Sequence, residues 1–388
     1  MTPTDRPRVL FSLTLLARNG VATHLKTLSR GLRERDWDVG IAAGAVTDDT
    51  PVSEDFMAEH GISYFRVPYP DFVRSSKSPR QALEAMAALH RVVRRFRPGV
   101  MHTLGLGITP FVYPMRLLHG VPLVSSCRNE PLPRVKALAQ RYAPLLPLLN
   151  PVFGNRVIAI SQELDQVLRE LWKVPPRRIR LVPNGIDDAR FRPPSPDERK
   201  RARASFGLSP EQPAVCLVGR LSWVKGHHVF VRALARLARR GRSVVGLCAG
   251  EGRLKEKIEA QAAELGVADR VRLLGHTDAR RVYWASDVCA LPSRREGFPN
   301  VIAEAMLCGT VPVRTPAGGV EDQVEDGVHG FIVPFDDPEA LADRIETLLE
   351  DDARRRCMSE RARCRALERF TASVMVKDTI AVYREVGA

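Results

Sequence analysis

Residues 288–306 read VCALPSRREGFPNVIAEAM. Val288–Leu291 is a short apolar run typical of a buried strand, and a polar segment follows it. Gly297 and Pro299 prevent one continuous helix through this segment, and proline suits the position just inside a helix start. We therefore expect a strand, a loop and a helix from Asn300, the basic unit of an α/β fold.

The same alternation of apolar runs and amphipathic stretches continues in both directions. The expected strands are Arg8–Leu13, Val39–Ala43, Ser63–Val67, Val100–Thr103, Leu123–Ser126, Arg156–Ile160, Ile179–Val182, Ala214–Gly219, Ser243–Ala249, Val271–Leu274, Val288–Leu291, Val311–Arg314 and Phe331–Val333. Helical patterns lie between them, for example His24–Glu34, Pro79–Arg95 and Gln162–Leu171. Nearly continuous apolar strands separated by helices predict parallel sheets that are covered on both faces.

A polar, proline-rich segment, FRPPSPD at residues 191–197, indicates a linker. We expect one doubly wound, Rossmann-like domain over residues 1–190 and a second over residues 191–372. A helix within residues 373–388 would pack back on the first domain. The carboxyl ends of the parallel strands would face a central cleft, where such sheets bind ligands.

Charged side chains gather at two of the expected strand-to-helix connections. Glu296 and Glu304 flank the helix start at Asn300, where free N–H groups and a positive dipole suit a diphosphate. Two surface glutamates without function explain that spacing equally well. Arg220 and Lys225 follow the end of another strand, where two cations can hold a leaving diphosphate without a metal. An ordinary basic loop is the alternative for this pair.

Further motifs stand in a characteristic order: Val182–Asp187, Gly219–Leu221, Lys225–Gly226, Ala249–Gly252, Leu274–His276, Glu296–Gly309, Gly318–Gly319, Asp326–Gly327 and Gly330. Over nearly its full length, the chain thereby resembles the retaining GT-B glycosyltransferases with an E-x7-E motif, which form glycosyltransferase family 4. The resemblance implies two Rossmann-like domains, the first on the acceptor side and the second binding a nucleotide-sugar donor. It also implies a retaining transfer to an acceptor hydroxyl without a metal, and it implies no cofactor.

The resemblance also assigns site residues. Those that would bind the donor are Gly20, Arg220, Lys225, His276, Phe298, Pro299, Asn300, Val301 and Glu304. Arg220 and Lys225 would neutralise the diphosphate, Glu304 would bind the ribose hydroxyls, and the main chain near His276 would hold the base. The catalytic candidates are Glu296 and His102. Glu296 would contact the donor sugar. It would not be a covalent nucleophile, because the usual proposal for the family is a front-face reaction without one.

The first half of the chain departs from the family pattern at two places. Gly20 stands in the loop after the first strand, but Val21 replaces the second expected glycine. His102 is the first residue of an expected His-x-His pair, whose second position is Leu104. The resemblance suggests a catalytic role for His102, but a lone histidine at a strand end is more often structural. Both roles therefore stay open.

The composition indicates a globular protein in a reducing compartment. The chain has 388 residues, of which 44% are hydrophobic, and seven scattered cysteines without a C-x-x-C pair. The first apolar run, Val9–Ala17, is too short to span a bilayer. We therefore expect a cytoplasmic protein. Its net charge of +14 favours anionic partners, and peripheral contact with the inner face of the membrane is a further expectation.

Two segments are candidates for contact with the acceptor. Asp71–Ser78 is a polar loop, and Arg128–Leu149 mixes basic residues with leucines and prolines that suit a lipid surface. A helix packed on the domain explains the second segment as well. The expected partners are a nucleotide-diphosphate sugar, a glycan or lipid-linked acceptor and an anionic membrane, but no nucleic acid. Such partners fit a hexosyl- or N-acetylhexosaminyltransferase of cell-envelope glycan or glycolipid assembly.

Other functions are weaker explanations of the sequence. A basic protein that binds membranes or nucleic acid without catalysis agrees with the charge, but aromatic residues make up only 6% and no nucleic-acid motif is present. Epimerases or phosphorylases of the same plan would need site residues that we cannot locate. Asp36–Asp38 precedes a strand rather than following one, and His227–His228 lacks a second pair of ligands, so no metal site is predicted.

Overall fold

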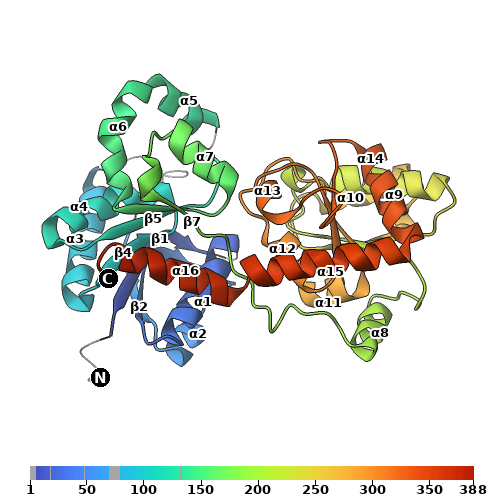
Figure 1. The fold of residues 1–388 in the computed structure, drawn as a ribbon, viewed down its shortest axis with the longest axis horizontal. Helices are drawn as coiled ribbons and strands as arrows, with labels where there is room; N and C mark the ends of the chain where they lie inside the picture. Colours follow the sequence, from blue (N-terminus) through green and yellow to red (C-terminus); the bar gives the residue numbers. More distant parts are fainter. Residues whose placement is uncertain (1–5, 18, 48, 70–78, 132) are drawn as a thin grey trace. The chain divides into compact units, whose positions relative to one another are not determined.

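The computed structural model describes residues 6–17, 19–47, 49–69, 79–131 and 133–388, and it comprises two compact units (Figure 1). The first unit ends at Gly185 and also includes Ala372–Ala388, and the second is Ile186–Thr371. The boundary lies a few residues before the predicted one at residues 190 and 191. Ile186 already belongs to the second unit, where its N–H donates to the Phe370 carbonyl at 2.8 Å. The candidate acceptor loop Asp71–Ser78 lies outside the described residues.

In its described part, the first unit is built on a seven-stranded parallel sheet with the order β3-β2-β1-β4-β5-β6-β7. Its strands are β1 Arg8–Leu16, β2 Asp38–Val46, β3 Ser63–Arg66, β4 Val100–Thr103, β5 Leu123–Cys127, β6 Arg156–Ala159 and β7 Ile179–Leu181. Its helices are α1 Gly20–Arg33, α2 Glu54–Glu59, α3 Pro79–Phe96, α4 Thr109–His119, α5 Pro133–Arg141, α6 Leu146–Leu149, α7 Gln162–Glu170 and α16 Ala372–Arg384.

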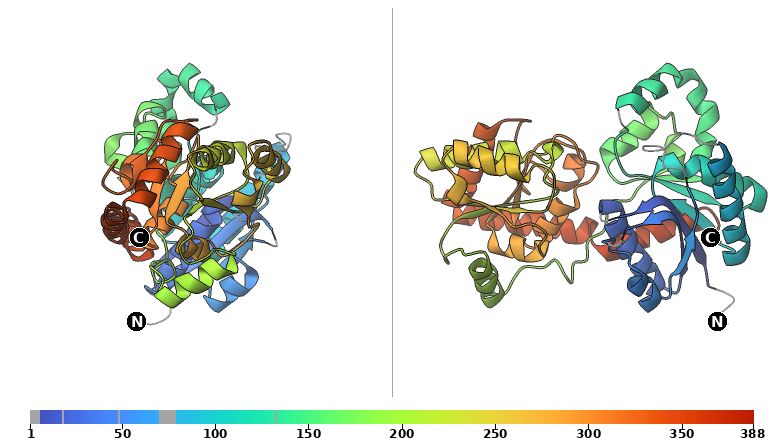
Figure 2. Two further views of the ribbon diagram at one scale, coloured as in Figure 1. Left: turned by 90° about the vertical axis from the view of Figure 1, so that its right-hand side faces the viewer. Right: turned by 180° about the vertical axis from the view of Figure 1, so that it is seen from behind.

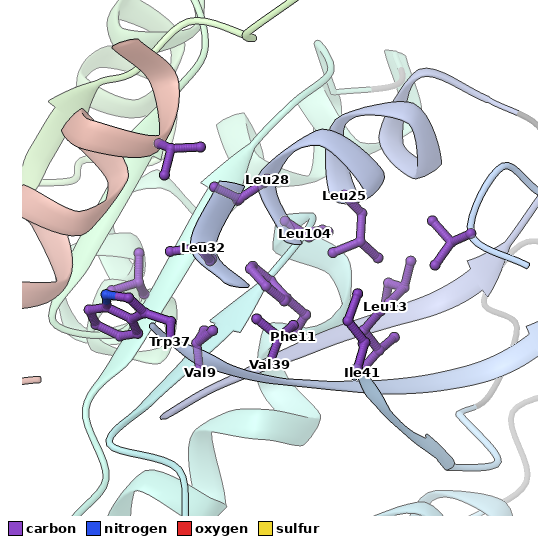
Figure 3. Close-up of a cluster of buried hydrophobic side chains, with 14 of the residues drawn as sticks. Val9, Phe11, Leu13, Leu25, Leu28, Leu32, Trp37, Val39, Ile41 and Leu104 are labelled. Carbon is purple, nitrogen blue, oxygen red and sulfur yellow. The ribbon is translucent and has the colours of Figure 1, made fainter. Parts of the chain in front are cut away.

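The sheet of the first unit is covered on both faces. Alternate residues of β1 enter different hydrophobic clusters: Phe11 packs with α1 and α16, and Leu10 packs with α3 and α4. Figure 3 shows the first cluster, with side chains of β1 and β2 facing Leu25, Leu28 and Leu32 of α1. Burying a large aliphatic or aromatic side chain of this kind contributes about 1.5–3 kcal/mol.

The carboxyl-terminal helix α16 completes this core. Gly31 of α1 lies so close to α16 that a β-carbon there would stand 2.5 Å from Val376 Cγ2. The rings of Trp37 and Tyr383 pack at 5.3 Å between centroids. Residues from the two ends of the chain therefore form one hydrophobic core.

The second unit repeats the plan with a six-stranded parallel sheet of order β10-β9-β8-β11-β12-β13. Its strands are β8 Ala214–Val218, β9 Val245–Ala249, β10 Val271–Leu273, β11 Val288–Leu291, β12 Val311–Arg314 and β13 Phe331–Ile332. Its helices are α8 Pro196–Ser205, α9 His227–Arg239, α10 Lys255–Glu264, α11 Ala279–Ala285, α12 Asn300–Leu307, α13 Val320–Gln323, α14 Pro338–Glu350 and α15 Asp352–Arg369. Figure 2 shows from two further sides how helices surround the sheet of each unit.

The predicted fold class is confirmed. Both sheets are parallel, and every expected strand is present, with ends that differ by at most a few residues. The helix expected from His24 begins earlier, at Gly20, because the Asn19 side chain accepts hydrogen bonds from Val21 N and Ala22 N and caps it. In the described part of the chain, no helix combines the length and the apolar character that a membrane span requires.

Candidate active site

Backbone contacts join the loops that follow β8, β9 and β10 in the second unit. Gly219 N donates to the Ala249 carbonyl at 2.9 Å, and Gly250 N donates to the Gly275 carbonyl at 2.8 Å. A β-carbon on Gly250 would lie 2.1 Å from the Gly219 carbonyl oxygen, so only glycine permits this approach. The exposed residues Arg220 and His276 follow these glycines at the carboxyl edge of the sheet.

Lys225 and Glu296 form an ion pair that fastens two of the candidate loops together. Lys225 Nζ lies 2.7 Å from Glu296 Oε1, and the two side chains are only 22% and 10% exposed. Gly226, with φ of 73°, follows the lysine, and a β-carbon there would lie 2.0 Å from the Pro292 carbonyl oxygen. The structure thus brings together one residue expected at the diphosphate and one expected at the sugar.

The start of α12 is held by a buried arginine. Arg314 is fully buried and donates to the carbonyls of Ala317 and Gly318, and its Nη1 donates to Gln323 Oε1 at 2.6 Å. Gln323 Nε2 in turn donates to the Pro299 carbonyl at 3.0 Å. The helix begins at Asn300, as predicted, with Pro299 as the residue before it. The relay fixes the Pro299 carbonyl.

Four expected donor residues surround this helix start. Phe298 is buried and packs edge-on against Phe370 with 5.2 Å between ring centroids. Asn300 and Val301 are half-buried in the first turn of α12. The main-chain N–H groups of the first turn of α12 therefore follow a fixed Pro299 carbonyl, and a helix start of this kind suits an anionic oxygen.

Glu304, in the second turn of α12, accepts a hydrogen bond from the Tyr283 hydroxyl at its Oε2 atom, at 2.9 Å. Burial raises the pKa of Glu304, and the Tyr283 hydrogen bond and the positive charge of Arg190 act against that increase. Arg190 itself lies 3.1 Å from Asp278, the residue that caps α11. The Glu304 carboxylate keeps its second oxygen for another donor of hydrogen bonds, such as a hydroxyl pair.

Gly20 occupies the first position of α1, directly after the capping residue Asn19. A β-carbon on Gly20 would meet no atom within 4 Å, so the backbone at this helix start is open to a ligand. This placement agrees with the loop that the sequence singled out, but Gly20 belongs to the first unit and the other donor candidates to the second.

The comparisons with known proteins agree with this arrangement. Residues 18–190 match the family model described as Glycosyltransferase Family 4, and residues 198–365 match the model described as Glycosyl transferases group 1. The chain is 32% identical over 370 residues to a D-inositol 3-phosphate glycosyltransferase of Xylanimonas cellulosilytica, covering 90% of this chain and 88% of that protein.

Solved structures have the same fold. A glycosyltransferase of Rickettsia africae superposes with a TM-score of 0.83 at 19% identity, covering 98% of this chain and 99% of the other. HepE of Anabaena, in complex with UDP and glucose, superposes with a TM-score of 0.80 at 23% identity over 97% and 99% of the two chains. The chain belongs to glycosyltransferase family 4. It is a glycosyltransferase with the GT-B fold.

In this family 4 enzyme, His102 is placed differently from the other candidates. Its side chain is 1% exposed, and its Nδ1 and Nε2 atoms hydrogen-bond the hydroxyls of Tyr383 at 2.6 Å and Ser126 at 2.7 Å. Burial lowers the pKa of His102 to about 3. Since both ring nitrogens are occupied in the core of the first unit, we propose a structural role for His102 in place of the catalytic one.

Sequence reasoning missed Tyr283, Arg190, Arg314 and Gln323. Tyr283 lies in an ordinary helical pattern, and Gln323 lies in a four-residue helix. Arg314 alone gave a signal, because it is a charged residue that ends an otherwise apolar strand, VPVR. A buried arginine of this kind needs several acceptors, and a loop rich in carbonyls follows it.

Proposed function

We propose that this glycosyltransferase transfers a hexosyl or N-acetylhexosaminyl group from a UDP-sugar to an acceptor hydroxyl, with retention of configuration and without a metal. The observation that carries the proposal is the assembly around α12, where the Lys225–Glu296 ion pair, a fixed helix start and the Glu304 carboxylate lie within one unit. HepE of Anabaena, which has a similar fold, forms complexes with UDP and glucose and with UDP-glucose.

The proposed roles follow from the chemistry of the side chains. Arg220 and Lys225 balance the negative charge that grows on the diphosphate while the bond between the sugar C1 atom and the phosphate oxygen breaks. Glu304 accepts hydrogen bonds from the ribose hydroxyls. The acceptor oxygen bonds to C1 on the same face, and its proton passes to a phosphate oxygen of the departing nucleoside diphosphate.

Glu296 acts on the donor sugar by binding and not as a covalent nucleophile. Its Oε1 atom lies 2.7 Å from Lys225 Nζ, and this ion pair directs the carboxylate toward the cation. When a diphosphate reaches Lys225, the carboxylate is released to accept a hydrogen bond from a sugar hydroxyl. Donor binding and sugar recognition are thereby coupled.

The acceptor is proposed to belong to cell-envelope glycan or glycolipid assembly, and the relatives named D-inositol 3-phosphate glycosyltransferase suggest a phosphorylated polyol as a first test compound. We further propose that residues 133–149 contact an anionic bilayer. This segment exposes Leu145, Leu148 and Leu149 by 49%, 77% and 54%. Exposed basic residues accompany them: Arg134, Lys136 and Arg141.

The central test is donor turnover by variants of the α12 assembly. Glu304→Ala, Arg220→Ala and Lys225→Ala should each lower kcat/KM for the donor by about 100-fold or more. The arginine and lysine substitutions remove a cation that balances the charge of the leaving diphosphate, and Glu304→Ala removes the acceptor for the ribose hydroxyls. Glu259→Ala and Lys257→Ala, exposed residues of the same unit, are the matched controls and should retain wild-type turnover.

The measurement starts from a panel of UDP-, GDP- and ADP-sugars, ranked by thermal stabilisation of the full chain. NMR of the product then reports the anomeric configuration, and the same assay with EDTA reports any need for a metal. Wild-type turnover in all three site variants would remove the assignment. An inverted product, or activity that EDTA abolishes and metal restores, would contradict the mechanism.

A further inference from the structure

Arg128 in the first unit is a buried cation that forms no ion pair with any described residue. Arg128 directly follows β5, and its side chain is 6% exposed. Its Nη2 atom donates to Asn184 Oδ1 at 2.7 Å. Within the described residues, its Nε and Nη1 atoms are buried and have no hydrogen-bond partner. Burial lowers the pKa of the Arg128 guanidinium to about 9, so the group is still charged at neutral pH.

Two other buried arginines show how this protein satisfies such a group when its role is structural. Arg314 is fully buried and donates to three carbonyl oxygens and to Gln323. Arg203, at 4% exposure, donates to the carbonyls of Ala285, Ser209 and Gln212. Arg128 lacks acceptors of this kind on two of its nitrogens, although an unpaired buried charge is expensive.

His24 of α1 is a second buried group without a partner. It is 5% exposed, and neither ring nitrogen has a hydrogen-bond partner among the described residues. Burial, and then the charge of Arg128, lowers the pKa of His24 well below its ordinary value, so the ring is neutral. A neutral imidazole still offers one N–H donor.

Arg128, Asn184 and His24 all follow strands of the first sheet, at the edge where α/β sheets bind ligands. Arg128 directly follows β5, Asn184 comes shortly after β7, and His24 lies on the helix that follows β1. The carboxyl ends of parallel strands lie at the same edge of a sheet, and ligands bind there. The nitrogens of Arg128 and His24 that have no partner among the described residues therefore belong to segments at this edge, where a ligand can supply the acceptors.

We propose that Arg128, together with His24 and Asn184, binds an anionic group of a substrate, either a phosphate or a carboxylate. The guanidinium has two free N–H directions, which suits bidentate contact with such a group. The inference rests on the proposed function only in that the anion belongs to a substrate of the transfer. Its source is the donor diphosphate or an acceptor that carries the anion.

Inorganic phosphate is the probe for the site, with the melting temperature of the full chain as readout at constant ionic strength. The Arg220→Ala/Lys225→Ala background removes the two cations of the second unit that are proposed to bind the diphosphate. Phosphate should raise the melting temperature of this background, and adding Arg128→Met should abolish the increase. Arg128→Lys should retain part of it, and Arg169→Met, which removes an exposed arginine of the same unit, should retain all of it.

A second readout needs no ligand. Because the Arg128 charge is buried without compensation, Arg128→Met should melt at or above the wild-type temperature in phosphate-free buffer. A phosphate effect that survives Arg128→Met would overturn the site, and so would a large loss of stability on that substitution, which would mark a structural arginine. Neither measurement depends on glycosyl transfer, so a failure of the proposed function is recognised separately.

Binding of UDP then identifies the source of the anion. If the donor supplies it, Arg128→Met should weaken UDP binding at least tenfold in calorimetry. If the acceptor supplies it, UDP binding should stay unchanged. D-inositol 3-phosphate should then raise the melting temperature of the Arg220→Ala/Lys225→Ala background more than inositol does, and adding Arg128→Met should abolish this difference.

Discussion

The hydrogen bond from Tyr283 to Glu304 concerns a single carboxylate on which donor binding is proposed to depend. Burial raises the pKa of Glu304. The group is therefore protonated at a higher pH than an ordinary glutamate, whose pKa is about 4.3. A protonated carboxyl accepts hydrogen bonds more weakly than a carboxylate, which makes the ribose contact sensitive to acid.

We predict that UDP binding to the wild type weakens as the pH falls through the raised pKa of Glu304. Glu304→Gln, which cannot ionise, should bind UDP more weakly at neutral pH and should lack this acidic decrease. Calorimetric dissociation constants between about pH 4.5 and 8, expressed as the ratio of variant to wild type, cancel the titration of UDP itself. A ratio that does not change with pH would contradict the role of Glu304.

The histidine shows why single residues are hard to assign from sequence. His102 is the last residue but one of β4, near the ligand edge of the sheet, as a catalytic histidine would be. Its partner Tyr383 is 281 positions away, on α16. The sequence around His102 does not predict that contact, because the partner lies on a helix that is far away in the sequence.

At the scale of elements, β12 and the short helix α13 position the start of α12. The relay from Arg314 through Gln323 to the Pro299 carbonyl links their ends. Element boundaries were largely predictable here, because apolar runs, Gly297 and Pro299 mark them directly. The relay was not, because its hydrogen bonds join side chains and carbonyls whose approach depends on the tertiary structure.

Two substitutions separate the two halves of this relay. Arg314→Met leaves several buried carbonyls without a donor and should lower the free energy of unfolding by about 2–5 kcal/mol. Gln323→Glu keeps an acceptor for Arg314 but loses the donor to Pro299, so it should preserve most of the stability and weaken UDP binding several-fold. Urea unfolding and calorimetry measure the two effects. Unchanged UDP binding in Gln323→Glu would show that the relay only stabilises the fold.

At the scale of the molecule, the proposed membrane contact combines the net charge of +14 with the exposed leucines of residues 133–149. Apolar insertion and attraction to anionic headgroups add in such surfaces. The overall architecture follows from the sequence pattern, since repeated strand and helix periods extend over the whole chain. The function of the exposed surface does not follow from the sequence pattern, because the sequence alone does not show whether a leucine is exposed or buried.

We predict that the protein sediments with vesicles containing about 30% phosphatidylglycerol and not with neutral phosphatidylcholine vesicles, and that salt weakens the binding. Leu145→Ser/Leu148→Ser/Leu149→Ser should reduce the bound fraction at least fivefold without changing donor turnover. Leu117→Ser/Leu118→Ser, at 65% and 67% exposure on α4, is the matched control. Equal sedimentation of the two variants would exclude residues 133–149 as the contact surface.

The core shared by α1 and α16 sets the order in which the chain can fold during synthesis. Strands β1 to β7 leave the ribosome first, but α16, which buries Val376 against Gly31 and presents Tyr383 to His102, is translated only after the second unit. The second unit, Ile186–Thr371, lies between them in the sequence. At roughly 5–20 residues per second, the first unit waits about 10–40 s for its last helix, while the second unit is already complete. The unit that is made first is therefore the one that folds last.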